Sequence, residues 1–404
     1  MGSTTREDLA GRVVVFGITG GIAAYKAPLI VRGLKADGLD VHTVLTDSAH
    51  HFVAPLSLQT VSNRPVYNSM FDTTSSADHE IDHISLADKA EIILIAPATA
   101  NFISKLAHGV ADDLLSCVCL ATQAPILVCP SMNTNMYMNR ATQDNIERLK
   151  ELGMFVLEPA AGELACGWEG AGRLPEPERI ISEVKKILTE EDLDGLNILI
   201  TCGPTCEDID PVRFITNRST GKMGSALVDA ACLRGAAVKV VTGPVDRQYP
   251  PWADVIRVRS AREMLSSVEA YLDGADVLIM AAAVADYVPA AYSESKIKKG
   301  GRVLSIDLKS SPDILSTVKR LKEDRYFVGF AAETDNIQDH ATGKLKKKGL
   351  DMIVANRVGE AGSGFASDTN SGVIITADGV LDDFEQMEKQ ELAHRILDYI
   401  KERL

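Results

Sequence analysis

The sequence lacks an excess of positive charge. Its 404 residues include 42 Lys and Arg against 56 Asp and Glu, which gives a formal net charge of −14. Because nucleic-acid binding depends largely on contacts between cationic side chains and phosphates, this balance argues against nucleic-acid binding as the main activity. An acidic chain that binds anionic metabolites has to gather its positive charge locally, so clusters of lysine and arginine are the places to examine.

Long apolar runs are also missing. No stretch reaches the roughly 18 uninterrupted apolar residues that a membrane helix needs. Residues 1–12 mix charged and small polar side chains and contain no apolar region of the kind found in secretory signals. We therefore expect a cytoplasmic protein that does not bind a membrane.

Two further patterns are absent. The seven cysteines are odd in number and include no CxxC pair, which argues against a disulfide framework and a zinc knuckle. The glycine-containing turns at residues 17–22 and 201–205 do not have the GxGxxG spacing, which argues against a nicotinamide dehydrogenase.

The chain does contain short apolar runs that alternate with helical patterns, which indicates a mostly parallel sheet covered on both faces. The pattern restarts after an acidic stretch at residues 189–195. We predict an α/β protein with two tandem three-layer parallel-sheet domains, flavodoxin-like or Rossmann-like, at residues 1–190 and 191–404. The predicted strands are residues 13–18, 41–46, 91–96, 125–129 and 154–157, then 197–201, 238–242, 276–282, 326–331, 352–355 and 373–377. The main predicted helices are residues 22–37, 178–188, 221–234 and 385–403, and Asp378-Gly379 predicts a hairpin turn.

The loops after the strands of the first half are the places to look for a ligand, because open α/β sheets bind ligands beyond the carboxyl ends of their strands. Residues 17–22, GITGGI, open a helix after the first strand, where glycine lets main-chain N–H groups approach a phosphate. The same loop is equally consistent with tight packing alone. Residues 96–101, APATAN, suit the close approach of a planar ring, although Thr99 also fits the role of a helix N-cap.

Three single side chains complete the candidates in the first half. Asn133 follows the strand at residues 125–129 and can either bind a carboxylate or cap its loop. His83 precedes a helical stretch, where a lone histidine is commonly a surface or capping residue. Cys166 lies among four glycines between residues 162 and 172, and we interpret this segment as a mobile flap that closes over a site.

The motifs GGIAAYK, DHI, APATAN, PSMN and ACG together resemble those of flavin-binding cysteine decarboxylases, in particular phosphopantothenoylcysteine decarboxylases. The resemblance implies bound FMN, which supplies the electron sink that loss of CO₂ from a cysteine carboxyl requires. It implies His83 in the catalytic base region, Asn133 as a contact of the substrate carboxylate, and Cys166 as the proton donor of the final reduction. The residues that it implies for FMN binding are Gly20, Gly21, Ile22, Thr46, Ala98, Thr99, Ala100 and Asn101.

The second half has a distinctive loop at residues 210–224, DPVRFITNRSTGKMG. It places Arg213, Asn217, Arg218 and Lys222 in a segment rich in Ser, Thr and Gly that enters a helix, which suits a phosphorylated substrate. The alternative is a solvated loop with a helix cap. Five more motifs follow in order: AAAVADY, KIKK, SPDIL, GFAAET, and a helix on which two lysines four residues apart share a face.

These six motifs resemble phosphopantothenate–cysteine ligases of the bacterial, CTP-using type. The resemblance implies that Arg213 and Asn217 bind and turn over an acyl-cytidylate, and we assign Lys296 to charge stabilisation at the α-phosphate. The residues that it implies for CTP binding are Asp286, Lys296, Pro312, Asp313, Ile314, Leu315, Phe330, Lys344 and Lys348. Mg²⁺ is expected with the nucleotide, without assigned ligands. One departure is Cys202, where we expect the family to carry a small alanine.

Together the two resemblances predict a bifunctional enzyme that makes 4′-phosphopantetheine from 4′-phosphopantothenate, L-cysteine and CTP. The alternatives are another flavin-dependent cysteine decarboxylase or flavin prenyltransferase fused to a Rossmann-like nucleotide-binding domain, and a non-catalytic flavoprotein subunit. The resemblance also implies a homo-oligomer. In such an oligomer, the first domains of the chains form trimers with shared flavin sites and the second domains form dimers. Members of the family assemble as dodecamers.

Overall fold

The structure is a computed structural model that describes residues 9–70, 82–163, 169–298, 304–333, 335–357 and 367–404. The chain folds as two compact units, the first ending at Thr189 and the second beginning at Glu190. No helix in the described part of the chain is long and apolar enough to cross a membrane.

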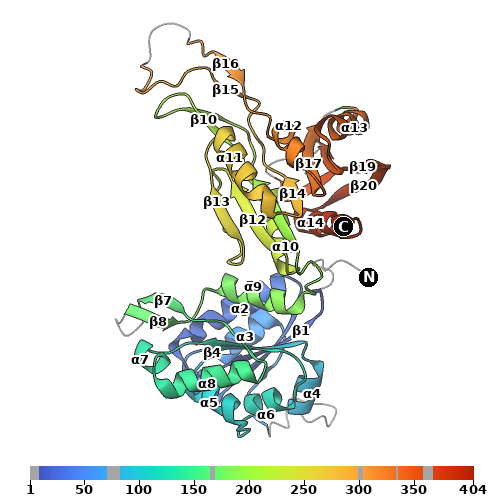
Figure 1. The fold of residues 1–404 in the computed structure, drawn as a ribbon. Coiled ribbons are helices and arrows are strands. Elements are labelled where there is room, and N and C mark those ends of the chain that lie inside the picture. The colour runs from blue at the N-terminus through green and yellow to red at the C-terminus, as the bar shows by residue number, and fades with distance from the viewer. Residues whose placement is uncertain (1–8, 71–81, 164–168, 299–303, 334, 358–366) are drawn as a thin grey trace. The chain divides into compact units, whose positions relative to one another are not determined.

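The first unit is built on a six-stranded parallel sheet in the order β3-β2-β1-β4-β5-β6 (Figure 1). The order reverses between β1 and β4, and in doubly wound sheets the ligand crevice forms at the carboxyl ends of such a strand pair. The five strands predicted for this half are confirmed within two residues, and the short β3 was missed. The strands are β1 (Val13–Ile18), β2 (Asp40–Leu45), β3 (Val66–Tyr67), β4 (Ile92–Ala98), β5 (Ile126–Pro130) and β6 (Phe155–Val156).

Helices cover both faces of this sheet because neighbouring strand residues are buried on opposite sides. Phe16 packs in the core under α2 (Ala27–Ala36), α3 (Pro55–Ser62) and α9 (Pro177–Leu188). Val15 packs in the core on the other face, whose helices are α4 (Asp82–Lys89), α5 (Ala100–His108), α6 (Leu114–Ala121) and α8 (Arg140–Glu151). The remaining elements are η1 (Ile22–Lys26), η2 (Asp47–His51), α7 (Thr134–Tyr137) and an antiparallel hairpin of β7 (Ala160–Glu163) and β8 (Glu169–Arg173).

The helix predicted at residues 22–37 is divided. Its first five residues form the 3-10 helix η1, and the α-helix α2 begins at Ala27 with proline in its first turn. Proline lacks the N–H that would bond to the preceding turn, so an α-helix starts at this point more readily than it continues through it.

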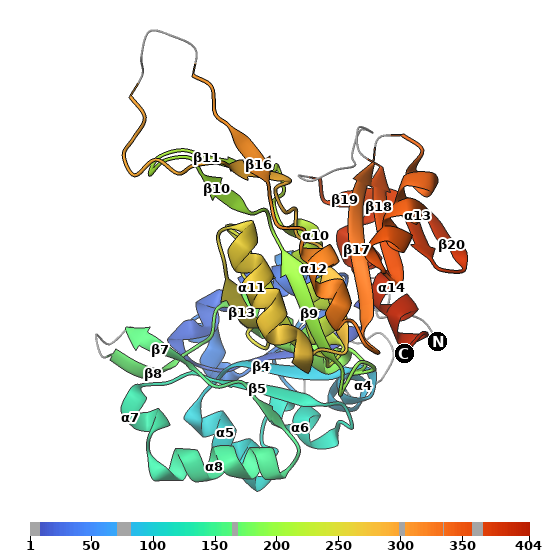
Figure 2. The same ribbon diagram turned by 45° about the horizontal axis from the view of Figure 1, so that its top comes forward.

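The second unit has an eight-stranded sheet in the order β13-β12-β9-β14-β17-β18-β19-β20 (Figure 2). All strand pairs from β13 to β18 are parallel. Strand β19 pairs antiparallel with β18 and with β20, so the predicted parallel sheet ends in a hairpin. The order reverses between β9 and β14, which sets a second switch point. The strands are β9 (Asn197–Cys202), β12 (Ala237–Thr242), β13 (Asp254–Arg257), β14 (Val277–Met280), β17 (Tyr326–Glu333), β18 (Met352–Arg357), β19 (Thr369–Thr376) and β20 (Gly379–Glu388).

Two cores flank this sheet. Ile200 packs in the core under α10 (Lys222–Leu233) and α14 (Lys389–Lys401). Leu199 packs on the opposite face, in the core that includes residues of α11 (Ala261–Tyr271), α12 (Ile314–Val318) and α13 (Ile337–Lys348). The short 3-10 helices η3 (Leu272–Gly274) and η4 (Lys319–Leu321) follow α11 and α12.

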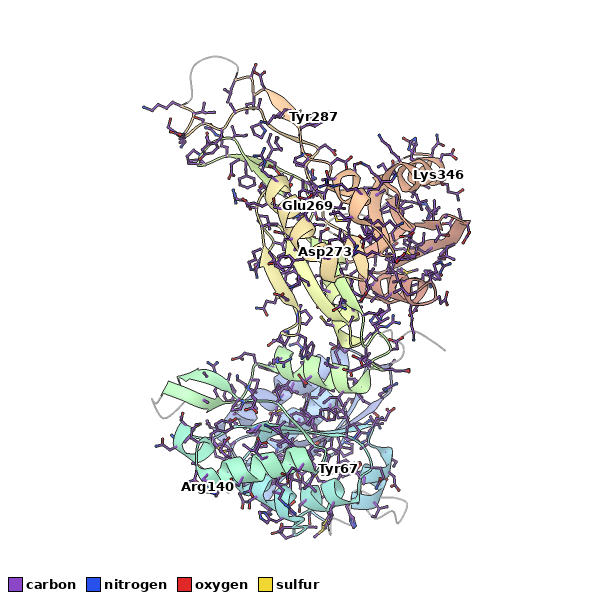
Figure 3. The ribbon with its side chains drawn as sticks, viewed as in Figure 1. Tyr67, Arg140, Glu269, Asp273, Tyr287 and Lys346 are labelled. Atoms are coloured by element: carbon purple, nitrogen blue, oxygen red, sulfur yellow. The ribbon has the colours of Figure 1, made fainter. Side chains whose placement is uncertain are left out.

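Two small antiparallel ribbons extend from the second unit in both views and are called the arm here (Figures 1 and 2). One pairs β10 (Cys206–Asp208) with β11 (Phe214–Thr216), and the other pairs β15 (Tyr287–Pro289) with β16 (Leu308–Ser310). Large apolar side chains are exposed on the arm, and Tyr287 is labelled there in Figure 3. The arm was not predicted from the sequence, because its strands are only three residues long.

The start predicted for the helix at residues 385–403 is wrong. Residues up to Glu388 belong to β20, and α14 begins at Lys389. The last pair of the β19–β20 ladder joins Thr369 to Glu388, so pairing across the hairpin holds this segment extended. The hairpin predicted at Asp378-Gly379 is confirmed, but its turn lies one residue earlier, at Ala377 and Asp378, because Gly379 begins β20 and pairs with Thr376.

Candidate active sites

The first switch point joins the loops after β1 and β4. Thr19 Oγ1 donates to the carbonyl of Pro97 at 2.7 Å and accepts from the main-chain N–H of Thr99 at 3.0 Å. Thr46 N donates to the carbonyl of Ile18 at 3.1 Å, which brings the loop after β2 to the same edge. The predicted FMN-binding residues therefore lie around the carboxyl ends of three neighbouring strands.

The glycine loop combines tight packing with an open helix start. A Cβ on Gly20 would lie 2.3 Å from the Cβ of Ser48, so this position requires glycine for close packing of the two loops. A Cβ on Gly21 would meet nothing closer than 3.7 Å. Gly21 is the N-cap of η1 and supplies no side-chain cap, and Ile22 is exposed. The main-chain N–H groups at this helix start therefore fit a phosphate.

The loop after β4 has small side chains. Ala98 is buried, Ala100 is half-buried and Asn101 is exposed at the start of α5. Thr99 is the N-cap of α5, and its Oγ1 accepts from Phe102 N at 3.3 Å. The capping role considered for Thr99 is thus confirmed, and the small residues beside it fit the planar ring of a flavin.

Asn133 lies next to the stem of the flap hairpin. Its Oδ1 accepts from Asn135 N at 2.9 Å as the N-cap of α7. The preceding Met132 donates its N–H to the carbonyl of Gly172, on β8, at 2.9 Å. A Cβ on Gly172 would lie 2.2 Å from the carbonyl oxygen of Met132. The hairpin stem is therefore fixed against the loop that carries Asn133, while Cys166 lies outside the described residues.

The helix that carries His83 lies away from the flap hairpin within one chain. It is half-buried in the first turn of α4, which packs against α6. Within the first unit, α4 and the β7–β8 hairpin lie on opposite sides in both ribbon views (Figures 1 and 2). A single chain therefore separates His83 from Asn133.

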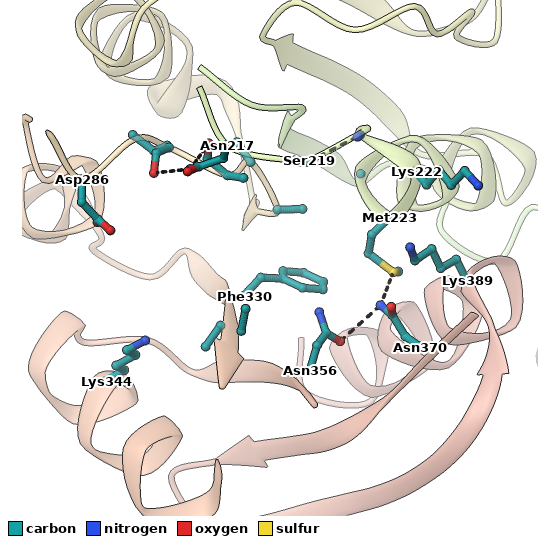
Figure 4. Close-up of a pocket in the computed structure, with 18 residues that line it drawn as sticks. Asn217, Ser219, Lys222, Met223, Asp286, Phe330, Lys344, Asn356, Asn370 and Lys389 are labelled. Carbon is teal, nitrogen blue, oxygen red and sulfur yellow. Dashed lines mark hydrogen bonds between the residues drawn. The ribbon is translucent and has the colours of Figure 1, made fainter. Parts of the chain in front are cut away.

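The second unit has a cavity of about 300 Å³ at its own switch point (Figure 4). It lies beyond the carboxyl ends of β14, β17 and β18 and beside the first turn of α10. It includes the predicted residues Asn217, Asp286, Phe330 and Lys344. The residues that line it are Asn217, Ser219, Gly221, Lys222, Met223, Gly224, Ala281, Ala282, Ala283, Val284, Asp286, Phe330, Ala331, Ala332, Lys344, Asn356, Asn370 and Lys389.

Asn217 joins two of the sequence motifs on one side of this cavity. Its Nδ2 donates to the carbonyls of Ala283 and Val284 at 3.0 and 3.1 Å (Figure 4). Thr205 Oγ1 also accepts from Ala285 N, at 3.1 Å, so the loops after β9 and β14 are tied together. The DPVRFITNRSTGKMG and AAAVADY motifs therefore form one wall.

Two of the predicted nucleotide-binding lysines are paired with carboxylates. Lys344 donates to Glu333 at 2.6 Å, and Lys348 pairs with Asp313 and donates to Ser316 Oγ at 3.1 Å. Burial alone would raise the pKa of Asp313, but hydrogen bonds from Lys348 and from Ser316 hold that pKa below its usual value. Asp313 is also the N-cap of α12.

Several predicted residues do not line the cavity described above. They are Arg213, Lys296, Lys348 and residues 312–315. The side chain of Ile314 belongs to the core, so this residue has only main-chain atoms to offer a nucleotide. Arg213 and Lys296 are instead associated with the arm, where Arg213 Nη1 donates to the carbonyl of Ile297 at 3.1 Å.

Sequence reasoning missed three polar residues of the cavity that lie outside the quoted motifs: Asn356, Asn370 and Lys389. Asn370 Nδ2 donates to Asn356 Oδ1 at 3.2 Å, and both lie on the antiparallel end of the sheet (Figure 4). Lys389 is buried, and burial together with the nearby charge of Lys222 lowers its pKa to about 8. Its only signal in the sequence was a lysine within the amphipathic helix predicted at residues 385–403, and such a lysine is more typical of a surface position.

Among the described residues, no group of three or more His, Cys, Asp or Glu side chains is arranged to hold a metal ion. Asp286 is the one acidic residue among those that line the cavity described above. A single carboxylate combined with substrate phosphates is a common way for proteins to hold Mg²⁺.

Comparison with known proteins covers both units. Residues 2–189 match the family described as Flavoprotein, and residues 193–404 match the DNA/pantothenate metabolism flavoprotein C-terminal domain. The chain is 44% identical over 399 residues to the coenzyme A biosynthesis bifunctional protein CoaBC of Vibrio parahaemolyticus, which covers 98% of this chain and 99% of that one. The proteins of the same name from Escherichia coli and Bacillus subtilis are 44% and 43% identical over 394 and 396 residues, covering 96% and 97% of both chains.

Solved structures are similar to each unit separately. The C-terminal domain of a coenzyme A biosynthesis bifunctional protein CoaBC gives a TM-score of 0.46 at 38% identity, covering 53% of this chain and 98% of that one. A PPC decarboxylase mutant complexed with pantothenoylaminoethenethiol gives a TM-score of 0.40 at 31% identity, covering 43% of this chain and 97% of that one.

Proposed function

The chain belongs to the CoaBC family of coenzyme A biosynthesis bifunctional proteins, and from this premise we propose which of its residues carry the two activities. It is a bifunctional enzyme, a phosphopantothenoylcysteine decarboxylase and a phosphopantothenate–cysteine ligase. The ligase step joins cysteine to 4′-phosphopantothenate. The decarboxylase step converts the product to 4′-phosphopantetheine and CO₂.

One observation carries the assignment of residues. In each unit, several of the sequence motifs meet at the carboxyl edge of a doubly wound sheet, at the point where the strand order reverses. In the second unit the loop at residues 210–224 and the AAAVADY and GFAAET motifs line a cavity, with Asn217 bonded to Ala283 and Val284. Ligands of doubly wound sheets bind at this position, so we assign the two active sites to these two edges.

In the ligase site we propose that CTP activates the carboxylate of 4′-phosphopantothenate. The carboxylate oxygen attacks the α-phosphate, pyrophosphate leaves, and an acyl-cytidylate forms. The cysteine amine then displaces CMP and loses its proton. Asp286, Phe330 and Lys344 line the cavity, and they are the contacts we propose for the nucleotide. The further contacts, from the residues that lie outside the cavity, are Lys296, Pro312, Asp313, Ile314, Leu315 and Lys348.

Charge explains the roles of the remaining ligase residues. The activation step concentrates negative charge on the nucleotide, which Lys296 and Mg²⁺ offset, with Asp286 as the carboxylate that would hold the metal. Arg213 binds the anionic intermediate, and Asn217 orients it. Both ribbons of the arm have exposed apolar side chains, which supports contact with a second copy through the arm.

In the decarboxylase site we propose FMN at the first switch point. When bound, FMN supplies the oxidation that makes decarboxylation possible and the later return of hydride. The main-chain N–H groups that follow Gly21 at the start of η1 bind its phosphate, because the N–H of Gly21 itself donates to the carbonyl of Thr19 at 2.9 Å. The small residues around Thr99 leave room for its ring. The other FMN contacts that we propose are Ile22, Thr46, Ala98, Ala100 and Asn101.

Substrate contacts in this site come from three places. Asn133 binds the substrate carboxylate, Cys166 donates the proton that accompanies hydride return, and His83 acts in the catalytic base region. Helix α4, which carries His83, and the β7–β8 hairpin, beside which the Asn133 loop lies, are on opposite sides of the first unit. A site shared between copies of the chain, as in a trimer, would bring the two together. A decarboxylase trimer combined with a ligase dimer is compatible with a dodecamer. The use of CTP supports a cytoplasmic location.

Pyrophosphate release tests the ligase. The purified chain should release pyrophosphate only when CTP, 4′-phosphopantothenate and Mg²⁺ are all present, and should form 4′-phosphopantothenoylcysteine when cysteine is added. ATP in place of CTP is the control for nucleotide choice. A chain that leaves CTP intact under these conditions would contradict the proposed mechanism.

Flavin absorbance tests the other half. The purified or reconstituted chain should be yellow, and should release CO₂ from supplied 4′-phosphopantothenoylcysteine without CTP. A colourless chain that does not take up FMN would overturn the assignment of the first switch point.

A further inference from the structure

The AAAVADY loop at residues 281–287 leaves the sheet before it forms a wall of the ligase cavity. Strand β14 ends at Met280, and the loop then pairs with the turn that follows β9. A β-bridge joins Ala283 to Pro204, and the N–H of Ala283 donates to the carbonyl of Gly203 at 2.9 Å. The position of this wall therefore depends on the turn after β9.

Thr205 follows this turn and contacts the loop with both its side chain and its main chain. The residue is fully buried, and its Oγ1 accepts from the N–H of Ala285 at 3.1 Å. Its own N–H donates to the carbonyl of Ala283 at 3.3 Å. Ala285 is only 4% exposed, and a buried N–H that has no acceptor is costly. The hydroxyl of Thr205 therefore fixes the main chain directly before Asp286.

The carbonyl of Thr205 contacts a different motif. It accepts from Thr216 Oγ1 at 2.8 Å. Thr216 is the last residue of β11 and directly precedes Asn217, whose side chain also bonds to the AAAVADY loop. Asn217 and Asp286 both line the cavity, on the same side of it (Figure 4). One residue thus holds the segment of Asn217 through its carbonyl and the segment of Asp286 through its hydroxyl.

We propose that Thr205 is a positioning residue of the ligase, which fixes Asn217 relative to Asp286. Thr205 is not among the described residues that line the cavity, so it acts through these two neighbours. The inference rests on the proposed ligase function, in which Asn217 orients the acyl-cytidylate and Asp286 contacts the nucleotide. A shift of one segment against the other misaligns the reacting groups even when each substrate still binds.

Substitution by valine and by serine separates the hydroxyl from the packing of the side chain. Thr205→Val keeps the shape of the side chain but leaves the N–H of Ala285 without this acceptor, so the loop has to move. The kcat for pyrophosphate release from CTP and 4′-phosphopantothenate should then fall about 100-fold. Thr205→Ser keeps the oxygen and should retain most of the wild-type kcat. Equal losses in the two variants would overturn the proposal, because the hydroxyl would not be the cause.

Substrate binding distinguishes positioning from collapse of the site. The affinity of the full chain for CTP and for 4′-phosphopantothenate is measured by calorimetry with each substrate alone, so that no turnover occurs. In Thr205→Val each affinity should fall much less than kcat, because each substrate keeps the contacts on its own segment. A loss of affinity as large as the loss of kcat would contradict a positioning role.

Thr242→Val is the matched control for stability. Thr242 is fully buried at the end of the neighbouring strand β12, and its Oγ1 bonds to Tyr249 at 2.8 Å and to the carbonyl of Gly243 at 3.1 Å. None of these three belongs to the described residues that line the cavity. The control should lower the Tm about as much as Thr205→Val does but keep the ligase kcat. A similar loss of kcat in both variants would mean that stability, and not position, controls turnover.

Thr216→Val keeps the proposal testable if Thr205→Val does not fold. Thr216 is exposed, so the loss of its hydrogen bond to Thr205 should leave the Tm nearly unchanged while kcat falls about tenfold. Wild-type kcat in Thr216→Val would sink the proposal. A wild type without CTP-dependent pyrophosphate release would contradict the proposed function, whereas an active wild type with equally active threonine variants would contradict the positioning role alone.

Discussion

The carboxylate of Asp210 accepts a hydrogen bond from the main-chain N–H of Ile297, with 3.1 Å between that nitrogen and Oδ2. The same carboxylate accepts from the N–H groups of Val212 and Arg213, both at 2.8 Å, and from Arg213 Nη1 at 3.1 Å. Desolvation by itself would raise the pKa of Asp210, but these three main-chain hydrogen bonds and the charge of Arg213 lower it. Asp210 therefore joins the segment of Arg213 to the segment that begins at Lys296.

We expect Asp210→Asn to impair the ligase while sparing the decarboxylase. The amide keeps the size of the carboxylate but turns an NH₂ group toward N–H donors, so one of the two segments has to move. Because small misplacements of binding groups can cost about 100-fold in rate, the ligase kcat/KM should fall by about that factor. Decarboxylation of supplied 4′-phosphopantothenoylcysteine is the internal control.

Asp208→Asn is the matched variant for this test. Asp208 lies two residues away, and its carboxylate accepts from the exposed side chain of Arg259 at 2.6 and 2.9 Å. It should retain most of the ligase activity. If Asp210→Asn behaved like Asp208→Asn at an unchanged Tm, Asp210 would not position the two segments.

A second prediction concerns Lys296 itself. Lys296→Gln removes the charge that we assign to the α-phosphate, so CTP-dependent pyrophosphate release should fall about 100-fold or more. Lys298→Gln is the control, because Lys298 is exposed in the same segment. The decarboxylase should be unaffected in both variants. Wild-type pyrophosphate release by Lys296→Gln would show that another group stabilises the activation step.

A third prediction concerns Cys166, which lies outside the described residues. Cys166→Ser should still release CO₂ but should stall before the final reduction, because a hydroxyl is a much weaker proton donor than a thiol. An oxidised enethiol product should then accumulate and be detectable by mass spectrometry. Normal formation of 4′-phosphopantetheine by the serine variant would exclude Cys166 as the donor.

The sequence predicted the parts of the fold that depend on apolar periodicity. The main parallel strands of both sheets were found because buried β-strands read as short apolar runs. The arm was missed because its three-residue strands are held by pairing and by Asp210 rather than by periodicity. The start of α14 was misplaced because strand pairing as far as Glu388 overrides an amphipathic pattern.

The residues of the candidate sites were likewise only partly predictable from the sequence. Loops after strands could be placed from the sequence because a parallel sheet brings the carboxyl ends of its strands to one edge. Thr99 and Asn133 both cap helices, which confirms the capping role considered for each of them. These capping hydrogen bonds leave other atoms of the two residues available to a ligand. Asn370 and Lys389 could not be found, because their position depends on the antiparallel end of the sheet, which the sequence did not reveal.

A fourth prediction tests how the flap stem is fixed. Gly172 has φ of 136°, and an added Cβ would lie 2.2 Å from the carbonyl oxygen of Met132. Gly172→Ala should therefore push β8 away from the loop of Asn133 and lower the decarboxylase kcat/KM about tenfold, with no effect on the ligase.

Gly162→Ala is the control for backbone strain. Gly162 has a similar φ of 149°, but a Cβ there would meet only Arg173 Nη1, at 3.9 Å. It should lose less decarboxylase activity than Gly172→Ala does. Equal losses in the two variants would mean that backbone strain, rather than contact with the Asn133 loop, controls the flap.

A fifth prediction concerns the stability of the second unit in acid. Arg234 is buried between Asp192, which it contacts at 2.7 Å, and Asp398, at 2.8 Å. Desolvation would raise the pKa of Asp192, but hydrogen bonds from Arg234 and Lys401 lower it to about 2. A carboxylate whose pKa is lower in the folded state stabilises that state above its unfolded pKa, near 4, and loses this contribution as the pH falls toward 2.

Asp192→Asn should accordingly lower the free energy of unfolding of the second unit by about 1–2 kcal/mol at pH 7, a value reduced for the solvent exposure of the carboxylate. The difference between the wild type and the variant should stay constant down to about pH 5 and then shrink toward pH 3. Calorimetry across this pH range measures it, with Asp194→Asn, at an exposed position of the same segment, as the control. A difference that persists unchanged at pH 3 would show that Asp192 stabilises the unit through packing rather than through its charge.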